Sequence, residues 1–228
     1  MRQDLVYCGL NRLNRLVCRV MYGIQAQPES PLPHDGPALI VCDHTSMGDP
    51  LVLLATAGRP IRFMMAQEIY VQPHIKWVFQ AFRCIPIRRG KRDVKAVRAM
   101  LEGLSSSEVM GLFPEGGLDR YRSDEGHPGI GYLALKSGAP VIPASIVWEN
   151  PRPLSMFKTL FVPCQARILY GAPILFPQET RPRKIAMQCC TNQVMEAIVH
   201  LRRTLLNQGH EKSRQEISRE KMESPPVA

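Results

Sequence analysis

The chain has 228 residues, of which 45% are hydrophobic, and this is enough to bury one sizeable core. Its formal net charge of +9 suggests an anionic partner, whether nucleic acid, an anionic membrane surface or a phosphorylated substrate. Seven cysteines without a C-x-x-C spacing argue against a disulfide framework and a zinc site, and no apolar run approaches the roughly 20 residues that span a bilayer.

An amphipathic helix is predicted over residues 3–22, within an N-terminal segment of residues 1–24. The apolar residues that recur at three- and four-residue steps, and so share one face, are Val6, Leu10, Leu13, Val17 and Val20. Arg12, Arg15 and Arg19 lie together on another face. Two interpretations stay open: a helix packed on the domain, or a basic helix in a membrane interface with its arginines on lipid phosphates.

A Pro-rich connector leads into a domain expected over residues 35–207, in which strand-like runs alternate with helix-like ones. Strands are predicted at residues 38–42, 61–65, 84–87, 108–113, 141–148, 157–163 and 165–170. Helices are predicted at residues 49–58, 74–82, 94–104, 130–138 and 183–207. This alternation predicts an α/β fold, with a central mixed sheet flanked by helices. Residues 208–228 are polar and charged, and we expect them to form a disordered tail.

A histidine and a carboxylate directly follow the strand predicted at residues 38–42. Histidine is the side chain best able to accept a proton near neutral pH, provided that its other ring nitrogen is held, and a carboxylate is the usual partner. A strand-to-helix turn can bring positions five apart into contact, so Asp49 can reach back to His44. A plain helix start would also place an Asp there. No G-x-S-x-G elbow is present, and an incoming hydroxyl that attacks directly, with His44 as base, needs no enzyme nucleophile.

Basic residues follow the strand predicted at residues 84–87, and Arg88 is the first of them. Arginine is suited to bidentate capture of phosphate. A solvated helix face would explain the later Lys95 and Arg98, but it explains less well an arginine directly after an apolar strand. Arg88 is therefore a candidate for binding a phosphorylated substrate.

A third polar turn follows the strand predicted at residues 108–113 and contains Glu115 and Gly116. Glycines at such a turn let backbone N–H groups approach an anion or a ligand closely. The plainer interpretation is a turn that only ends the strand.

Together, four blocks resemble, in order and spacing, the glycerolipid acyltransferase family that makes phosphatidic acid from lysophosphatidic acid. The family's H-x-x-x-x-D block corresponds to His44–Asp49, and its short apolar strand ending in Arg resembles Ile85–Arg88. F-P-E-G is present as Phe113–Gly116, and Val141–Ala144 resembles an apolar strand with a central proline. The resemblance covers roughly residues 35–170, and four ordered blocks make it specific.

The chain departs from the family's pattern at two places. The family usually follows F-P-E-G with Thr or Ser and then Arg, whereas this chain has Gly117 and Leu118, so Arg120 or Arg122 would have to substitute. A lysine often found after the second strand is replaced by Gln67. Both changes fall where the acceptor head group or the acyl donor is handled, and substrate identity is therefore less defined than reaction type.

The resemblance implies that His44 takes the proton from an acceptor hydroxyl while Asp49 holds the imidazole. The hydroxyl oxygen then attacks an acyl thioester, with no cofactor or metal, and the donor is acyl-CoA or acyl carrier protein. Arg88, Glu115 and Gly116 would hold the phosphate end of a lysophospholipid acceptor, above all 1-acylglycerol-3-phosphate, with Glu115 orienting Arg88 or a glycerol hydroxyl.

The expected location is the cytoplasmic face of an anionic membrane, as a peripheral protein. Within the enzyme class, glycerol-3-phosphate or a lyso-aminolipid is an alternative acceptor. A non-enzymatic, basic nucleic-acid-binding protein is the alternative from another class. Because no nucleic-acid-binding motif is recognised and only 7% of residues are aromatic, we expect no nucleic acid partner. An inactive lipid-binding relative is disfavoured because His44 and Asp49 are both present.

Overall fold

The structure is a computed structural model that describes residues 2–27, 32–88, 93–114, 128–149 and 163–223, with side chains described between residues 5 and 209. The strands are β1 (Gln25–Gln27), β2 (Ala38–Cys42), β3 (Ile61–Ala66), β4 (Ile85–Ile87), β5 (Val109–Leu112), β6 (Val141–Glu149) and β7 (Gln165–Tyr170). The helices are α1 (Arg2–Tyr22), α2 (Asp49–Thr56), α3 (Gln67–Tyr70), α4 (Lys76–Ala81), α5 (Val94–Ser105), α6 (Gly129–Ser137) and α7 (Lys184–Glu223).

The strands form one mixed sheet in the order β1-β7-β6-β2-β5-β3-β4. Neighbouring strands are parallel except β6 and β7, which pair antiparallel. The predicted fold class, a central mixed sheet flanked by helices with an N-terminal helix, is confirmed. Because β2, β5, β3 and β4 run parallel, their carboxyl ends meet at one edge of the sheet, where binding sites of α/β folds form.

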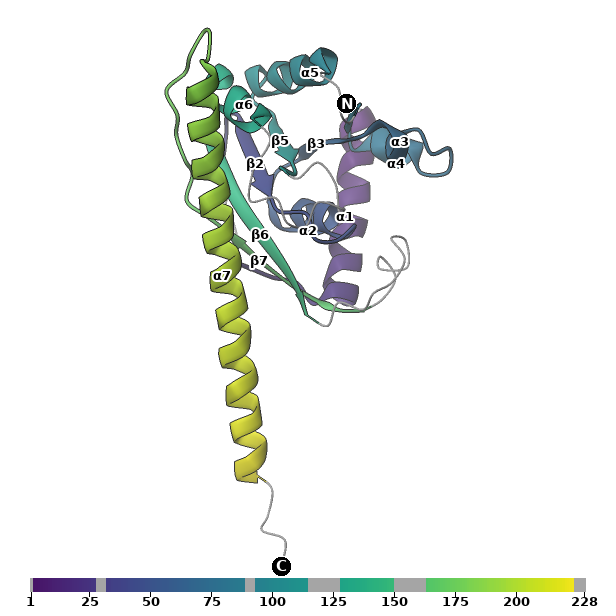
Figure 1. Cartoon of the computed structure of the whole chain (residues 1–228). Helices are drawn as coiled ribbons and strands as arrows, with labels where there is room; N and C mark the ends of the chain where they lie inside the picture. The colour runs from purple at the N-terminus through teal and green to yellow at the C-terminus, as the bar shows by residue number, and fades with distance from the viewer. Residues whose placement is uncertain (1, 28–31, 89–92, 115–127, 150–162, 224–228) are drawn as a thin grey trace, which may run out of the picture.

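Alternate residues of β2 pack on opposite sides of the sheet, as the two-residue period of a strand requires. Ile40 and Cys42 belong to a core shared with α1 and α2, whereas Leu39 and Val41 belong to a core shared with α5, α6 and α7. All five residues of β2 are fully buried, which is typical of a central parallel strand covered on both faces. Figure 1 shows α1 and α2 on one side of the sheet and α7 on the other.

Helix α1 packs on the domain through a different face from the predicted apolar stripe. Tyr7, Cys18 and Tyr22 are buried in the core, and Asn14 Nδ2 donates to the carbonyl oxygen of Leu51 on α2 at 3.0 Å. These inward residues recur at steps of seven and four residues, close to two turns and one turn of helix, so they share one face.

The predicted stripe itself faces away from the domain. Its exposed members, together with two neighbouring leucines, are Leu5, Val6, Leu13, Leu16, Val17 and Val20, while Leu10 is partly buried. Contact with the sheet therefore does not account for the hydrophobicity of this face. Arg12, Arg15 and Arg19 are exposed beside it.

Helix α7 is longer than the sequence analysis predicted, since it continues to Glu223 instead of ending near residue 207. The segment predicted as a disordered tail, residues 208–228, is therefore described as helical as far as Glu223. The added segment is rich in Glu, Lys, Arg and Gln, which favour helix, and the next proline is Pro225. Forty residues correspond to about 60 Å of helix, and Figure 1 shows α7 projecting beyond the sheet.

Two smaller differences concern the middle of the chain. The helix predicted at residues 74–82 is shorter, Lys76–Ala81, and the unpredicted short helix Gln67–Tyr70 precedes it. The strand predicted at residues 157–163 lies almost wholly outside the described residues. Within the described ranges, no helix is long and apolar enough to cross a membrane.

Candidate active site

The site is built at the turn that joins β2 to α2, on the side of the sheet covered by α1 and α2. Asp49 is the first residue of α2, and Pro50, which lacks an N–H, follows it at a position where prolines start helices readily. The chain thereby reverses between His44 and Asp49, and His44 Nδ1 lies 2.9 Å from Asp49 Oδ2. The structure thus brings the two side chains together across the turn.

Asp49 is fully buried and accepts hydrogen bonds from four N–H groups. Oδ2 lies 2.6 Å from the backbone N of Thr45 and 2.7 Å from that of Ser46, in addition to His44 Nδ1. Oδ1 accepts from the indole Nε1–H of Trp148 at 2.7 Å. A buried charge is tolerated when it is hydrogen-bonded, and these bonds also fix the orientation of the carboxylate.

The contacts of Asp49 define which nitrogen of His44 carries a proton. Because an ionised carboxylate is acceptor-only, the proton between it and His44 belongs to Nδ1. In the neutral imidazole, Nε2 then holds the free lone pair and is the atom that can accept a proton. The His44 side chain is 13% exposed, so the ring is largely covered but remains reachable.

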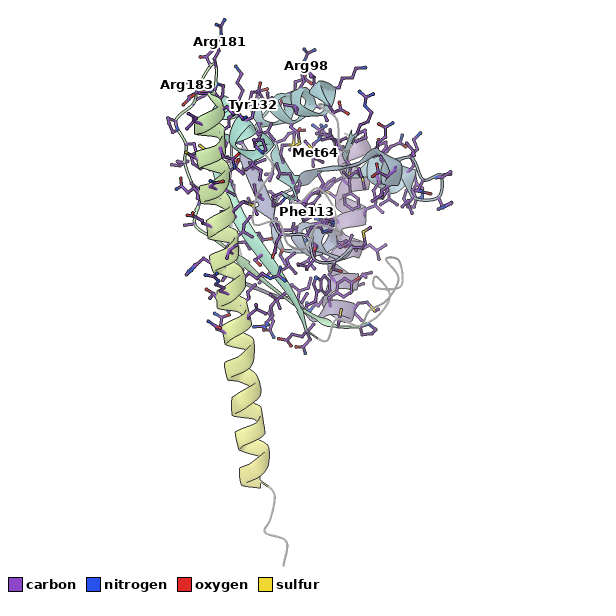
Figure 2. All side chains as sticks on the ribbon, viewed as in Figure 1. Met64, Arg98, Phe113, Tyr132, Arg181 and Arg183 are labelled. Atoms are coloured by element: carbon purple, nitrogen blue, oxygen red, sulfur yellow. The ribbon has the colours of Figure 1, made fainter. Side chains whose placement is uncertain are left out.

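Two aromatic rings extend from the histidine on the same side of the sheet, the first stacked on His44 and the second on the first ring. The ring of Phe113, just after β5, stacks on His44 with centroids 4.2 Å apart, and Phe63 of β3 stacks on Phe113 at 5.7 Å. Figure 2 shows Phe113 where the strands end near α2. A ring stacked on the imidazole face restricts the rotation of the imidazole.

A second buried carboxylate, Asp43, precedes the histidine and has a different environment. Its Oδ2 accepts from Ser145 Oγ at 3.0 Å and pairs with Arg202 Nη1 at 2.8 Å, and its Oδ1 accepts from the backbone N of Ile146. Burial raises the pKa of the Asp43 carboxyl, and the charge of Arg202 opposes this rise. Asp43 therefore ties the end of β2 to β6 and to α7.

Arg88 follows β4 and is held by Asp93, the N-cap residue of α5. Its backbone N–H and its Nε both donate to Asp93 Oδ2, at 3.1 and 3.4 Å. The Arg88 side chain is 60% exposed, so most of the guanidinium faces solvent. Two strands separate β4 from β2, which places Arg88 at the same edge as His44 but about 14 Å away by strand spacing.

The other residues named from the sequence pattern are not all described. Glu115 and Gly116, and also Arg120 and Arg122, lie outside the described residues. Gln67 begins α3 directly after β3 and is exposed, so it too lies at the carboxyl edge of the sheet.

The motifs are matched by a whole-domain comparison. The sequence profile of the acyltransferase family matches residues 23–147, which is more than half of the chain. The chain belongs to the acyltransferase family. The resemblance to glycerolipid acyltransferases inferred from four short motifs is thereby confirmed.

Two individual acyltransferases show how far the likeness extends. The chain is 28% identical over 132 residues to the chloroplastic 1-acyl-sn-glycerol-3-phosphate acyltransferase LPAT1 of Arabidopsis thaliana. That match covers 55% of this chain and 35% of the relative, so the chain spans about a third of the relative's length. The crystal structure of the 1-acyl-sn-glycerophosphate acyltransferase PlsC from Thermotoga maritima superposes with a TM-score of 0.59 at 20% identity, over 85% of this chain and 80% of that one. At this identity the superposition shows a common fold.

Sequence reasoning did not identify the contact of Trp148 with Asp49 or that of Phe113 with His44. Both residues stood at the ends of predicted strands, residues 108–113 and 141–148, but neither was assigned a contact with His44 or Asp49. A signal existed for Trp148, because Ala144, Ile146 and Trp148 alternate along β6 and so face the same side as Cys42.

Proposed function

We propose that this protein transfers a fatty acyl group from a thioester donor, acyl-CoA or acyl carrier protein, to the hydroxyl of 1-acylglycerol-3-phosphate and so forms phosphatidic acid. The observation that carries the proposal is the contact of His44 Nδ1 with the buried, four-times hydrogen-bonded Asp49. The family and the activity for which the Arabidopsis relative is named support the choice of substrate class.

The proposed reaction uses His44 as the base. Nε2 removes the proton from the acceptor hydroxyl as its oxygen attacks the thioester carbonyl carbon. The C–S bond then breaks, the acyl group stays on the acceptor oxygen, and the proton passes from the imidazolium to the leaving sulfur. Asp49 stabilises the positive charge that develops on the ring, as the buried carboxylate does in a catalytic triad.

Arg88 is the proposed binding site for the phosphate of the acceptor. It stands at the same sheet edge as His44, its guanidinium can bind phosphate through two parallel hydrogen bonds, and most of its side chain is in solvent. The two strands are about 14 Å apart, and the arginine side chain together with the acceptor's glycerol phosphate would span this distance. Glu115 and Gly116 remain proposed partners for the same head group.

The exposed face of α1 supports a proposal about location. Leu5, Leu13, Leu16 and Val20 are more than half exposed and lie beside exposed arginines. An apolar face flanked by basic side chains is typical of a helix that lies in a membrane interface. We therefore propose that α1 holds the enzyme peripherally on an anionic bilayer, on its cytoplasmic face, where a lysophospholipid acceptor would be presented.

An assay with purified protein tests the function. Labelled acyl-CoA and acyl carrier protein donors are each offered with 1-acylglycerol-3-phosphate, glycerol-3-phosphate or a lyso-aminolipid on anionic vesicles, and the lipid products are separated. Phosphatidic acid formation that depends on His44 is expected. Product from glycerol-3-phosphate or the lyso-aminolipid instead would reassign the acceptor, and no product from any pair would overturn the proposed activity.

A further inference from the structure

The indole of Trp148 reaches the His44–Asp49 dyad because β6 is longer than the neighbouring strand β2. Ala144 is paired with Cys42, the last residue of β2, and β6 continues for five more residues to Glu149. This extension pairs only with β7 in the described part of the sheet, with Trp148 opposite Ala166. It therefore runs past the His44–Asp49 turn, and its outermost aromatic side chain can donate to Asp49.

Two further residues fix the position of the indole. A Cβ added to Gly48 would lie 2.6 Å from Cη2 and 2.8 Å from Cζ2 of Trp148, so only glycine leaves room for the six-membered ring. Gly48 has φ of −78°, which any residue adopts, so this close approach and not backbone strain demands the glycine. On another side, Tyr22 packs edge-on against the ring with centroids 5.0 Å apart.

We propose that Trp148 is a positioning residue for acyl transfer, which holds Asp49 in the orientation that His44 requires and connects the end of α1 to the dyad through Tyr22. This inference rests on the proposed function. Trp148 donates to Oδ1, whereas the other three donors bind Oδ2, so among the described residues it is the donor that fixes the rotation of the carboxylate from its second oxygen. Loss of this bond leaves a buried acceptor atom unpaired and lets the carboxylate turn.

Nuclear magnetic resonance of the indole N–H groups tests the contact without turnover. The chain has two tryptophans, and Trp77 on α4 is 57% exposed with its Nε1–H on the carbonyl oxygen of His74. The Trp148 signal should exchange slowly with solvent and move on Asp49→Asn, while the Trp77 signal should not move. A Trp148 signal that exchanges as fast as that of Trp77 and ignores Asp49→Asn would overturn the contact.

Kinetics test the role. Trp148→Phe keeps an aromatic ring and removes the N–H, and it should lower kcat by roughly 10-fold or more while the acceptor and donor KM values stay within about twofold. Trp77→Phe is the matched control and should leave kcat unchanged. If Trp148→Phe lowers the melting temperature strongly, benzothienylalanine at position 148 replaces only the N–H by sulfur and should give the same loss of kcat. Wild-type kcat in the benzothienylalanine protein would overturn the role.

A variant at Gly48 tests the hydrogen bond between Trp148 and Asp49 by displacing the indole instead of removing its N–H. Gly48→Ala should displace the indole and lower kcat to a similar extent, although Trp148 retains its N–H. Gly129→Ala is the matched control, because a Cβ there meets nothing within 4 Å. Gly48→Ala with unchanged kcat would show that the indole position does not matter, and the proposal would fall.

A double-mutant cycle separates positioning from general damage. Because Trp148 is proposed to act through Asp49, Trp148→Phe should lower kcat less than twofold further in an Asp49→Asn protein. An equal loss in both backgrounds would mean that Trp148 only supports the fold. The proposed function fails separately, if the wild-type protein acylates none of the acceptors, and the indole exchange experiment still reports on the contact in that case.

Discussion

Phe113 stacks on His44 with an angle of 22° between the ring planes, although the two residues follow different strands. The register of the sheet explains the contact, since Val41 of β2 is paired with Leu112 of β5. The residues that follow these strands therefore emerge side by side at the carboxyl edge. The stack holds the imidazole by its face while Asp49 holds it by Nδ1, and the two contacts together fix the orientation of the ring.

Phe113→Leu should lower kcat by about 2- to 12-fold, because an aromatic contact is worth roughly 0.5–1.5 kcal/mol beyond its buried area. The leucine keeps the site apolar but does not fix the imidazole plane. Steady-state kinetics with both substrates measure the effect. A change confined to either KM would assign Phe113 to substrate binding instead.

His44→Ala should lower acyl transfer by about 10²–10⁴-fold while the protein stays folded, because the proposed general base is removed. Asp49→Asn should also be severe, since an amide cannot stabilise an imidazolium. The measurement is initial rate with 1-acylglycerol-3-phosphate, and a thermal melt of each variant is the control. Near wild-type turnover in His44→Ala would contradict the mechanism.

Arg88→Ala should raise the acceptor KM by about 10- to 150-fold, the value of one charged hydrogen bond of roughly 1.5–3 kcal/mol. The variant should keep its fold, because its backbone N–H still donates to Asp93 and an exposed ion pair contributes little to stability. Arg98→Ala, exposed on α5 and labelled in Figure 2, is the matched control. A rise in the donor KM alone would assign Arg88 to the thioester carrier.

Leu13→Ser and Val20→Ser on α1 should weaken binding to anionic vesicles and slow turnover on a bilayer acceptor. Activity on a short-chain, water-soluble acceptor should stay, because neither side chain contributes to the buried core. Deletion of the whole helix is a poorer test, since Tyr7, Cys18 and Tyr22 belong to the core.

Leu175→Ser, at an exposed position before α7, is the control for loss of apolar surface elsewhere. Raising the salt concentration should release the wild-type protein only in part, because screening weakens the arginines, each worth about 1 kcal/mol, but not the apolar face. Full vesicle binding by both α1 variants would remove the membrane role of this helix.

Asp93→Ala should lower the melting temperature by roughly 2–4 °C at pH 7, as expected for loss of a helix N-cap. The backbone N–H of Arg88, followed by that of Ala96, holds the pKa of the Asp93 carboxyl below its ordinary value. A lowered pKa means that the stabilisation is present above the unfolded value of about 3.9 and is lost as the pH falls through the folded value.

The difference in melting temperature between wild type and Asp93→Ala should therefore become smaller as the pH is lowered from 7 through 4 and below. Asp35→Ala is the control, because this carboxylate is 94% exposed. A difference in melting temperature that stays constant over this pH range would show that Asp93 stabilises the fold independently of its charge.

The sequence by itself determined the alternation of strands and helices and the turn at which His44 and Asp49 meet. Both depend on short-range regularities: the two-residue period of a strand, the 3.6-residue period of a helix, and a reversal of five residues with a proline at the helix start. The polar residues at strand ends could be named for the same reason, because chemistry in parallel sheets gathers where strands end.

Only the tertiary structure decided what surrounds the dyad. Trp148 meets Asp49 across 99 positions, and this requires the parallel pairing of β2 with β6 and the extra length of β6. The outward orientation of the apolar face of α1 could not be predicted either, because periodicity shows that a helix has an apolar face but not which face packs on the sheet. Tyr7 and Cys18 are buried because they pack against β3 and α2, respectively. Such long-range packing leaves no local pattern in the sequence.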